Sequence, residues 1–509
     1  MHRAFPRTAA PRGTRPRGRV LRRAASALLA VLLGLSHVAP AHAQGIDDLP
    51  RLGSAGGDEL TPAAERKLGE RVMRELRSAG VVHDDAELTD WLGGFASTLA
   101  ATRTASGADL EFFLVQDGSI NAFALPGGWI GVHTGLVVAA QTESQLASVL
   151  AHEIGHVTQR HIARMLAQQR QGSLLALAGL VLGALAARSS PDAFIGIATL
   201  GQSLAMQRAL SFSRDAEREA DRIGFEMLGE GGFDPNGAVE FFGRLQQANR
   251  IQESSAPVYL RTHPLTADRI ADMQSRIREQ RYRQRPDRLE FRLVRAKLRA
   301  LQDTSVDGLR GARTYFDQLQ RGVGAADPVP WFGVATAALA QRDFDAARRA
   351  LGEARTRVPG GSHPFLERLG VDLAMASQDA AAALAAAKAA RARYPDARSI
   401  ARLHARALLN AGDARAAVSA LRDQLALRPG DATMWRMLSD AHASLGDAGQ
   451  AHRAAGEGFA LSGALAGAIE QFQLAQRAGG LDFITASLVD TRLRVLREQF
   501  AEDEKERRR

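Results

Sequence analysis

The chain has 509 residues, 45% of them hydrophobic and 24% charged, which is enough for two or three domains with cores. It contains no cysteine, which excludes disulfides, Cys-ligated zinc, iron–sulfur clusters, thiol nucleophiles and a lipid anchor attached through cysteine. The formal net charge of +9 suggests nucleic-acid binding, but no recognised nucleic-acid-binding fold or basic-aromatic stripe accompanies it.

The N-terminal segment, residues 1–43, has the features of an export signal. It holds eight arginines and no acidic residue, then an apolar run from Ala24 to Leu35, then Ala41-His42-Ala43. This order is typical of a secretory signal peptide with cleavage before Gln44, whereas a retained anchor would need a longer apolar run of ~20 residues. We therefore expect a soluble exported protein, periplasmic where the cell has two membranes. Cleavage would lower the net charge from +9 to +1.

The next residues predict helices followed by a small sheet. Apolar residues recur with helical spacing over Thr61–Arg77 and again over Asp85–Leu99. The period then changes: Leu110–Val115 is typical of a strand, and Asn121–Leu125 with Trp129–Thr134 is typical of a hairpin-like pair. The first domain is therefore expected to be mostly helical, with a small sheet beside a long helix.

The long helix carries the first catalytic motif. Thr142 and Gln145 fit the N-cap and N3 positions of a capping box, and the helix continues into His152-Glu153-Ile154-Gly155-His156. This H-E-x-x-H pattern places both histidines on one helix face, where their imidazoles can bind one zinc ion. Glu153 can then accept the proton of a water molecule at the open metal position. A helix with two surface histidines is the alternative.

The third ligand is expected further along the chain. The extended pattern H-E-x-x-H-x-x-G-x-x-H fails here, and His161 stands off the required spacing, so we expect it on the helix surface or behind a ligand. Glu217 and Asp221 are four residues apart in a second helical segment, which gives a carboxylate ligand and a neighbour that hydrogen-bonds a ligand histidine or donates a proton. Glu219 should point away and pair with arginines.

A repeated pattern predicts an α-solenoid in the C-terminal part. Four aspartates 36, 34 and 34 residues apart are each followed four positions later by alanine, and three prolines keep the same spacing. Such a unit resembles the tetratricopeptide repeat, in which small residues let two helices approach closely. An Ala-rich helical bundle is the alternative. The residues concerned are Asp343, Asp379, Asp413, Asp447, Ala347, Ala383, Ala417, Ala451, Pro359, Pro395 and Pro429.

Together these patterns predict a mainly α protein: a zincin-type protease domain with a small sheet, followed by a repeat solenoid. The expected segments are a signal peptide at 1–43, a protease domain at 44–289, repeats at 290–475 and a C-terminal helix with a charged tail at 476–509. The charge run from Ala501 to Arg509 is expected to be solvated.

The motifs HEIGHVTQRH and FSRDAEREADRIG, preceded by NAFALPGGWIGVHTGL, resemble those of zinc metalloproteases of the HtpX, Oma and CAAX-prenyl types. The resemblance implies one zinc ion per subunit on His152, His156 and Glu217, a general base at Glu153 and a proton donor at Asp221. It also implies that the segment beginning Asn121, Ala122, Phe123, Ala124 and ending at Gly128 forms an edge strand on which an extended substrate pairs.

Two further features belong to the same resemblance. His263, in Thr262-His263-Pro264, is expected near the metal as a fourth ligand that blocks the water site or as a transition-state donor, with an ordinary loop histidine as the alternative. The apolar stretch from Ser173 to Ala187 is expected to form a lid or hydrophobic helix over the cleft, with peripheral membrane contact or ordinary core as alternatives. Deleting 173–187 should raise casein cleavage if it is a lid.

Two classes of function remain. The first is an exported zinc endopeptidase whose repeats bring protein clients to the metal. By the resemblance, these would be misassembled outer-membrane β-barrel proteins and their assembly machinery. The second is a periplasmic chaperone or scaffold in which proteolysis is latent or secondary.

Overall fold

The computed structural model describes residues 60–168, 212–251, 257–278, 285–322 and 326–507. These residues all lie in one compact unit, Asp58–Arg509. The expected signal peptide and the apolar stretch at 173–187 lie outside the described residues. No helix in the described ranges has the length and apolar character needed to cross a membrane.

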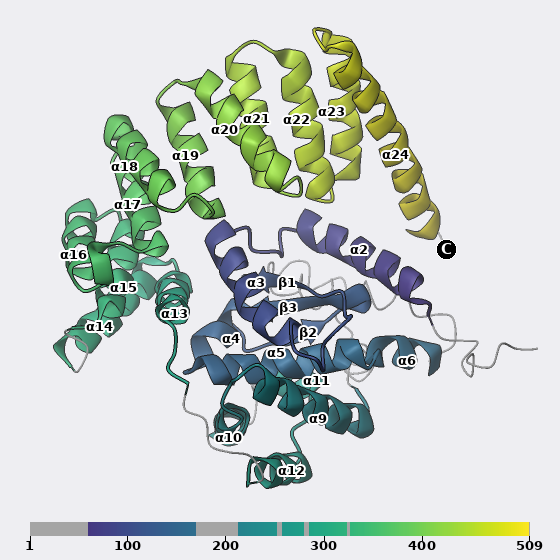
Figure 1. Cartoon of the computed structure of the whole chain (residues 1–509), viewed down its shortest axis with the longest axis vertical. Helices are drawn as coiled ribbons and strands as arrows, with labels where there is room; N and C mark the ends of the chain where they lie inside the picture. The colour runs from purple at the N-terminus through teal and green to yellow at the C-terminus, as the bar shows by residue number, and fades with distance from the viewer. Residues whose placement is uncertain (1–59, 169–211, 252–256, 279–284, 323–325, 508–509) are drawn as a thin grey trace, which may run out of the picture. The chain divides into compact units, whose positions relative to one another are not determined.

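The first part of the described chain consists of helices and a three-stranded sheet (Figure 1). The two helices expected near the N-terminus are present, and each begins after the residue that caps it, Thr61 or Asp85. The elements are α2 (Pro62–Ser78), α3 (Ala86–Ala100), β1 (Glu111–Val115), β2 (Ala122–Ala124), the 3₁₀ turn η2 (Pro126–Gly128), β3 (Trp129–His133), α4 (Thr134–Ala139), α5 (Glu143–Thr158), α6 (His161–Gln168), α9 (Arg214–Glu230), α10 (Asn236–Ile251), α11 (Val258–Thr262) and α12 (Ala267–Arg278).

The sheet has the strand order β1-β3-β2, so β2 lies at an edge. The expected hairpin is confirmed, because β2 pairs antiparallel with β3. β1 pairs parallel with β3, with Phe113 opposite Gly131. A Cβ at Gly131 would lie 2.5 Å from the ring of Phe123 and 2.9 Å from that of Phe113, so the two aromatic rings meet across β3 only because this residue is glycine.

The helix α5 begins at the predicted cap. The side chain of Thr142 accepts a hydrogen bond from the backbone N–H of Gln145 at 3.2 Å. The side chain of Gln145 accepts from the backbone N–H of Gln141 at 2.8 Å, one residue earlier than the reciprocal bond of a standard capping box. Both bonds satisfy N–H groups around the start of the helix that carries the H-E-x-x-H motif.

The second part of the described chain is a series of antiparallel helix pairs, so the fold is mainly α with a tetratricopeptide-type solenoid (Figure 1). The four repeated aspartates are N-caps of the second helices of successive pairs, and the alanines four positions later are buried. The helices are α13 (Leu289–Leu301), α14 (Val306–Arg321), α15 (Pro328–Ala340), α16 (Phe344–Thr356), α17 (Pro364–Ala376), α18 (Ala380–Arg393), α19 (Arg398–Asn410), α20 (Ala414–Leu427), α21 (Ala432–Ser444), α22 (Ala448–Leu461), α23 (Leu465–Ala478) and α24 (Phe483–Arg507), with the 3₁₀ turn η4 (Pro359–Gly361).

The charged end of α24 is not simply solvated, which corrects the sequence expectation. The side chain of Asp503 is only 15% exposed and forms an ion pair with Arg74 of α2 at 3.0 Å. Glu502 pairs with Lys67 at 3.0 Å. Glu502 and Asp503 therefore contact basic residues of α2, a helix that is remote in sequence.

Candidate active site

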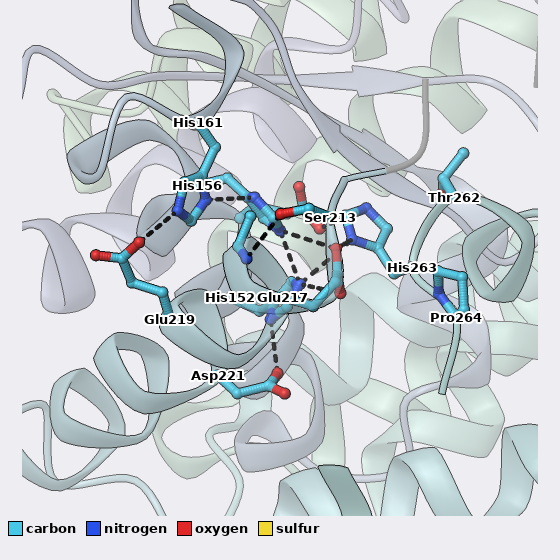
Figure 2. A network of polar contacts seen from close by, with 12 residues as sticks. His152, His156, His161, Ser213, Glu217, Glu219, Asp221, Thr262, His263 and Pro264 are labelled. Carbon is cyan, nitrogen blue, oxygen red and sulfur yellow. Dashed lines mark hydrogen bonds and ion pairs between the residues drawn. The ribbon is translucent and has the colours of Figure 1, made fainter. Parts of the chain in front are cut away.

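The helices α5 and α9 bring three of the predicted ligands together (Figure 2). The Nε2 atoms of His152 and His156 lie 3.0 Å apart. The carboxylate of Glu217 reaches both rings, with Oε2 at 3.4 Å from Nε2 of His152 and Oε1 at 3.4 Å from Nε2 of His156. All three side chains are buried.

His263 joins this group from the end of α11, where it is the C-cap residue. Its Nδ1 lies 3.3 Å from Nε2 of His152 and 3.0 Å from Oε1 of Glu217, and its side chain is 2% exposed. Within the described residues, these four side chains form a group whose ligand atoms all lie within 4.8 Å of one another. His263 is therefore part of the cluster and not an ordinary loop histidine.

The spacing of these atoms fits one small metal ion. A tetrahedral ion bound at about 2.0–2.1 Å places its ligand atoms about 3.3–3.4 Å from one another. The five separations given above run from 3.0 to 3.4 Å and involve both oxygens of Glu217, and with one ligand atom from each residue the four atoms lie within 4.8 Å of one another. Burial alone would raise the pKa of the Glu217 carboxyl, but the neighbouring histidines, His263 first among them, hold it well below its ordinary value. Glu217 is therefore ionised, as a metal ligand must be.

Glu153 lies beside this cluster with an unusual environment. Its side chain is completely buried, and neither carboxylate oxygen accepts a hydrogen bond from the described residues. Nε2 of His263 lies 3.5 Å from Oε1 of Glu153. Leaving a buried carboxylate without hydrogen bonds is costly, so this position is suited to a group that binds water or substrate.

Asp221 contacts His152 on the side away from the cluster, and Arg269 in turn binds Asp221. Oδ1 of Asp221 lies 2.9 Å from Nδ1 of His152, the ring nitrogen that faces away from the cluster. Arg269 holds both carboxylate oxygens of Asp221, with bonds of 2.6 and 2.8 Å. Burial alone would raise the pKa of Asp221, but Arg269 and His152 outweigh it and lower the pKa below its ordinary value.

His156 is held in a similar way, by His161 and Glu219. Nδ1 of His161, the first residue of α6, lies 2.8 Å from Nδ1 of His156. Its Nε2 lies 3.0 Å from Glu219, which also pairs with Arg164 at 2.8 Å. His161 therefore lies behind the ligand His156, which is one of the two positions expected for it. Glu219 pairs with an arginine as expected, and it also contacts His161.

Aromatic rings enclose the cluster. Phe212 stacks on His156 with ring centroids 3.9 Å apart. Tyr259, which is fully buried, stacks on His263 with centroids 4.7 Å apart. These apolar faces keep water away from the imidazoles and restrict the orientations that the rings can adopt.

The segment expected to bind substrate lies close to these helices. Ala122, Phe123 and Ala124 form the edge strand β2, and Asn121 precedes it. β2 packs against α5, the helix of the H-E-x-x-H motif. The backbone N–H of Tyr259 donates to the carbonyl of Ile120 at 3.2 Å, so the start of this segment is also bonded to α11.

Sequence reasoning missed two residues of the site. Arg269 donates to Asp221 and to the carbonyl of Pro264, the latter at 2.9 Å, and it pairs with Glu217 at 2.7 Å. Tyr259 drew no attention. The only sequence signals were the position of Arg269 six residues after His263 and that of Tyr259 four residues before it, and neither spacing predicts a contact without the fold.

Comparisons with known proteins agree with this site. Residues 87–277 match peptidase family M48. The chain is 32% identical over 95% of its length to the beta-barrel assembly-enhancing protease of Escherichia coli, of which 98% is covered. It is 31% identical to that of Yersinia pestis, covering 94% of this chain and 99% of the relative. The mitochondrial metalloendopeptidase OMA1 of Schizosaccharomyces pombe is 34% identical over 31% of this chain and 44% of its own. The chain belongs to peptidase family M48 and is a metallopeptidase.

Proposed function

We propose that the protein is an exported zinc endopeptidase that degrades misassembled outer-membrane β-barrel proteins, and that its repeats recruit these clients. The observation that carries the catalytic part is the buried group of His152, His156, Glu217 and His263 beside the unpartnered carboxylate of Glu153. Nitrogen and carboxylate donors gathered in one such buried group favour one zinc ion per subunit.

The proposed mechanism assigns a role to each polar group. A bound metal ion supplies Lewis acidity, which polarises the scissile carbonyl and lowers the pKa of a water molecule. Glu153 accepts the proton of that water and passes it to the departing amine, and its buried carboxylate has no competing hydrogen bond among the described residues. The apolar walls formed by Phe212 and Tyr259 limit the access of further water.

For Asp221 the geometry favours one of the two roles that the sequence allowed. Its contact with Nδ1 of His152 fixes the orientation of that ring, and its pairing with Arg269 favours the ionised form. A carboxylate held in this way is a poor proton donor. We therefore propose that Asp221 positions the ligand and that proton donation falls to another group.

His263 is proposed to keep the site latent. Its ring stands between the ligands and the general base, with one nitrogen facing Glu217 and the other facing Glu153. In this position it would act as a fourth ligand of a metal held by His152, His156 and Glu217, at the place that the nucleophilic water and the scissile carbonyl would need. Proteolysis then requires His263 to move, which favours the fourth-ligand role over the transition-state role.

The edge strand β2 is the proposed place of substrate binding. An extended polypeptide can add to the open side of β2 by backbone hydrogen bonding, and β2 packs against the helix that carries Glu153. Such pairing requires an unfolded segment, which restricts cleavage to misassembled clients.

The relatives' names support the biological setting. Proteins named for enhancing beta-barrel assembly match this chain over nearly their whole length. The N-terminal sequence fits export, and we therefore propose the periplasm as the location and the β-barrel assembly machinery as a partner. The blocking position of His263 favours one alternative: a repeat-based chaperone or scaffold whose protease is latent.

The test is metal analysis together with a casein-cleavage assay on protein that begins at Gln44. The wild type should contain one zinc ion per chain and cleave casein, whereas Glu153→Gln should keep zinc and lose cleavage by at least about 100-fold. If Glu153→Gln fully corrects the defect of a strain that lacks the protein, the chaperone alternative is favoured. Absence of zinc from the wild-type protein would contradict the enzyme proposal.

A further inference from the structure

The repeats contain a polar cavity that the catalytic site does not use. It lies between α19 and α21 and has a volume of about 470 Å³. Its wall is formed by side chains of these two helices and carries guanidinium, amide and hydroxyl groups beside an apolar patch. The lining residues are Arg406, Leu409, Asn410, Thr433, Arg436, Met437, Asp440 and Ser444.

A carboxylate from the protease part already binds at one end of this cavity. Asp84, which precedes α3, accepts a hydrogen bond from the hydroxyl of Thr433. It pairs with Arg402 of α19 at 2.8 Å and with Arg436 of α21 at 3.4 Å. Burial alone would raise the pKa of Asp84, but Arg402 and Thr433 outweigh it and lower the pKa. The same two helices therefore bind an ionised carboxylate within the protein itself.

The helical spacing places a second, similar position next to the first. Arg402, Arg406 and Asn410 are four residues apart on α19, so they follow one another along one face. Arg436 stands between the two positions, because it contacts Asp84 and also lines the cavity. Arg406 and Asn410 are exposed, and neither has a hydrogen bond or ion pair in the part of the chain that the structure describes.

The charge of the cavity favours an anion. The lining carries two guanidinium groups, Arg406 and Arg436, and one carboxylate, Asp440; because Arg436 pairs with Asp84, Arg406 is the guanidinium open to a ligand. Met437 and Leu409 add an apolar surface that suits the aliphatic part of a polypeptide.

We propose that this groove binds the acidic side chains of extended polypeptide segments and that Asp84 is its internal occupant at the first position. Asp84 lies within a continuing chain, between His83 and Asp85, so the groove accepts an internal residue and does not need a free C-terminus. The proposal specifies the recruiting role suggested above for the repeats and rests on it. An acidic client that reaches the first position would displace Asp84, and so would compete with the contact between the repeats and the protease part.

The test measures peptide binding directly, by fluorescence anisotropy, with the full chain carrying Glu153→Gln so that no peptide is cleaved. The probe is a fluorescein-labelled octapeptide with two aspartates and an amidated C-terminus. One comparison peptide has asparagine in place of aspartate, and another is neutral with a free C-terminal carboxylate. Arg406→Ala is the test variant, and Arg415→Ala, an exposed arginine on α20 outside the cavity lining, is the matched control.

The aspartate peptide should bind, with affinity about tenfold weaker for the asparagine peptide and for Arg406→Ala, and unchanged for Arg415→Ala. Asp84→Asn should bind it more tightly, because the internal carboxylate no longer competes. Equal binding of the aspartate and asparagine peptides, or no effect of Arg406→Ala, would overturn the proposal. If the neutral peptide with a free C-terminal carboxylate bound more tightly than the aspartate peptide, the groove would recognise a C-terminus and not acidic side chains. None of these results depends on proteolysis, so they are independent of the zinc and cleavage assays.

Discussion

At the scale of single residues, each cluster histidine of α5 has its second ring nitrogen held by a neighbour. Nδ1 of His152 faces Asp221, and Nδ1 of His156 faces His161, which in turn faces Glu219. Such contacts fix the tautomer and direction of a ligand ring before the metal arrives. The affinity for metal therefore depends on residues that never touch it.

Replacing Asp221 tests this dependence. Asp221→Asn should lower metal affinity by about 10- to 100-fold, because the amide cannot match the carboxylate as a partner of His152. The measurement is a zinc-binding competition with a chromophoric chelator, with circular dichroism to confirm the fold. Asp215→Asn is the matched control, since Asp215 lies on the same helix and its side chain is 87% exposed. Unchanged zinc affinity with a loss of turnover would instead indicate the proton-donor role.

Removing the His263 ring tests latency. His263→Ala should retain the metal on the three remaining ligands and raise basal casein cleavage several-fold, because the fourth corner of the tetrahedron becomes free for water. The rate is compared with that of His404→Ala, a histidine of α19 in the repeats, which should match the wild type. If His263→Ala changes neither cleavage nor zinc content, His263 does not block the site.

The residues that sequence predicted share one property: their relation is local. The i, i+4 spacing of His152 and His156, and of Glu217 and Asp221, follows from helix geometry alone. Arg269 and His161 depend on how α12 and α6 pack against these helices, and no spacing in the sequence encodes that packing. His263 was placed near the metal only by the family resemblance.

At the scale of elements, α5 and α9 hold the ligands together because two glycines let their backbones approach. A Cβ at Gly155 would lie 3.0 Å from the carbonyl oxygen of Ala220, and one at Gly224 would lie 3.0 Å from the backbone nitrogen of His152. In both cases the nearest atoms belong to the backbone, which cannot turn aside as a flexible side chain can.

Gly224→Ala should therefore move α9 away from α5. We expect a loss of about 1–3 kcal/mol in the free energy of unfolding, together with weaker zinc binding, because Glu217 moves with α9. The control is Gly94→Ala in α3, where an added Cβ meets nothing within 4 Å. That change should stabilise the protein by about 0.5–1 kcal/mol. Urea unfolding and zinc titration measure both effects, and equal stability of the two variants would refute the close-packing argument.

Elements were predicted well where their signal lies within a short stretch. The helices that start at Thr61 and Asp85, the cap at Thr142 and the hairpin of β2 and β3 follow from neighbouring residues. The parallel pairing of β1 with β3 was not predicted, because β2 lies between them in sequence and parallel partners carry no turn signal. The short helix α4 was also missed, since its six residues directly follow β3.

At the scale of the whole molecule, a buried group of charges joins the protease part to the repeats. Lys297 of α13 lies 2.7 Å from Asp85 and 2.9 Å from Glu87 at the start of α3. Arg368 of α17 contacts the same two carboxylates at 2.9 and 3.0 Å. These partners are more than 200 residues apart, and the apolar core beside them is also continuous from α5 through α17. The sequence could predict two domains but not this junction.

The junction makes a pH-dependent contribution to stability. Burial alone would raise the pKa of Asp85, but Lys297 and Arg368 outweigh it and hold the pKa well below its ordinary value. A carboxyl whose pKa is lower in the folded than in the unfolded chain stabilises the fold above its unfolded pKa of about 3.9. That contribution is lost as the pH falls further, toward the folded pKa.

Asp85→Asn isolates this contribution, because asparagine caps a helix as well as aspartate does and only the charge is removed. At pH 7 the variant should be less stable than the wild type by about 3 kcal/mol, since Lys297 then keeps only Glu87, which it shares with Arg368, and Arg368 keeps Asp372 besides. The gap should stay constant from pH 7 to pH 5 and narrow below about pH 4, because Asp85 of the unfolded wild type takes up a proton there, whereas the variant has no carboxyl to protonate. Urea unfolding midpoints measured at these pH values test the predicted change in the gap.

The control is Asp345→Asn in α16, because the side chain of Asp345 is 80% exposed, and this change should alter stability little at any pH. A gap that persists unchanged at pH 3 would show that shape and packing, and not the charge of Asp85, hold the repeats to the protease part.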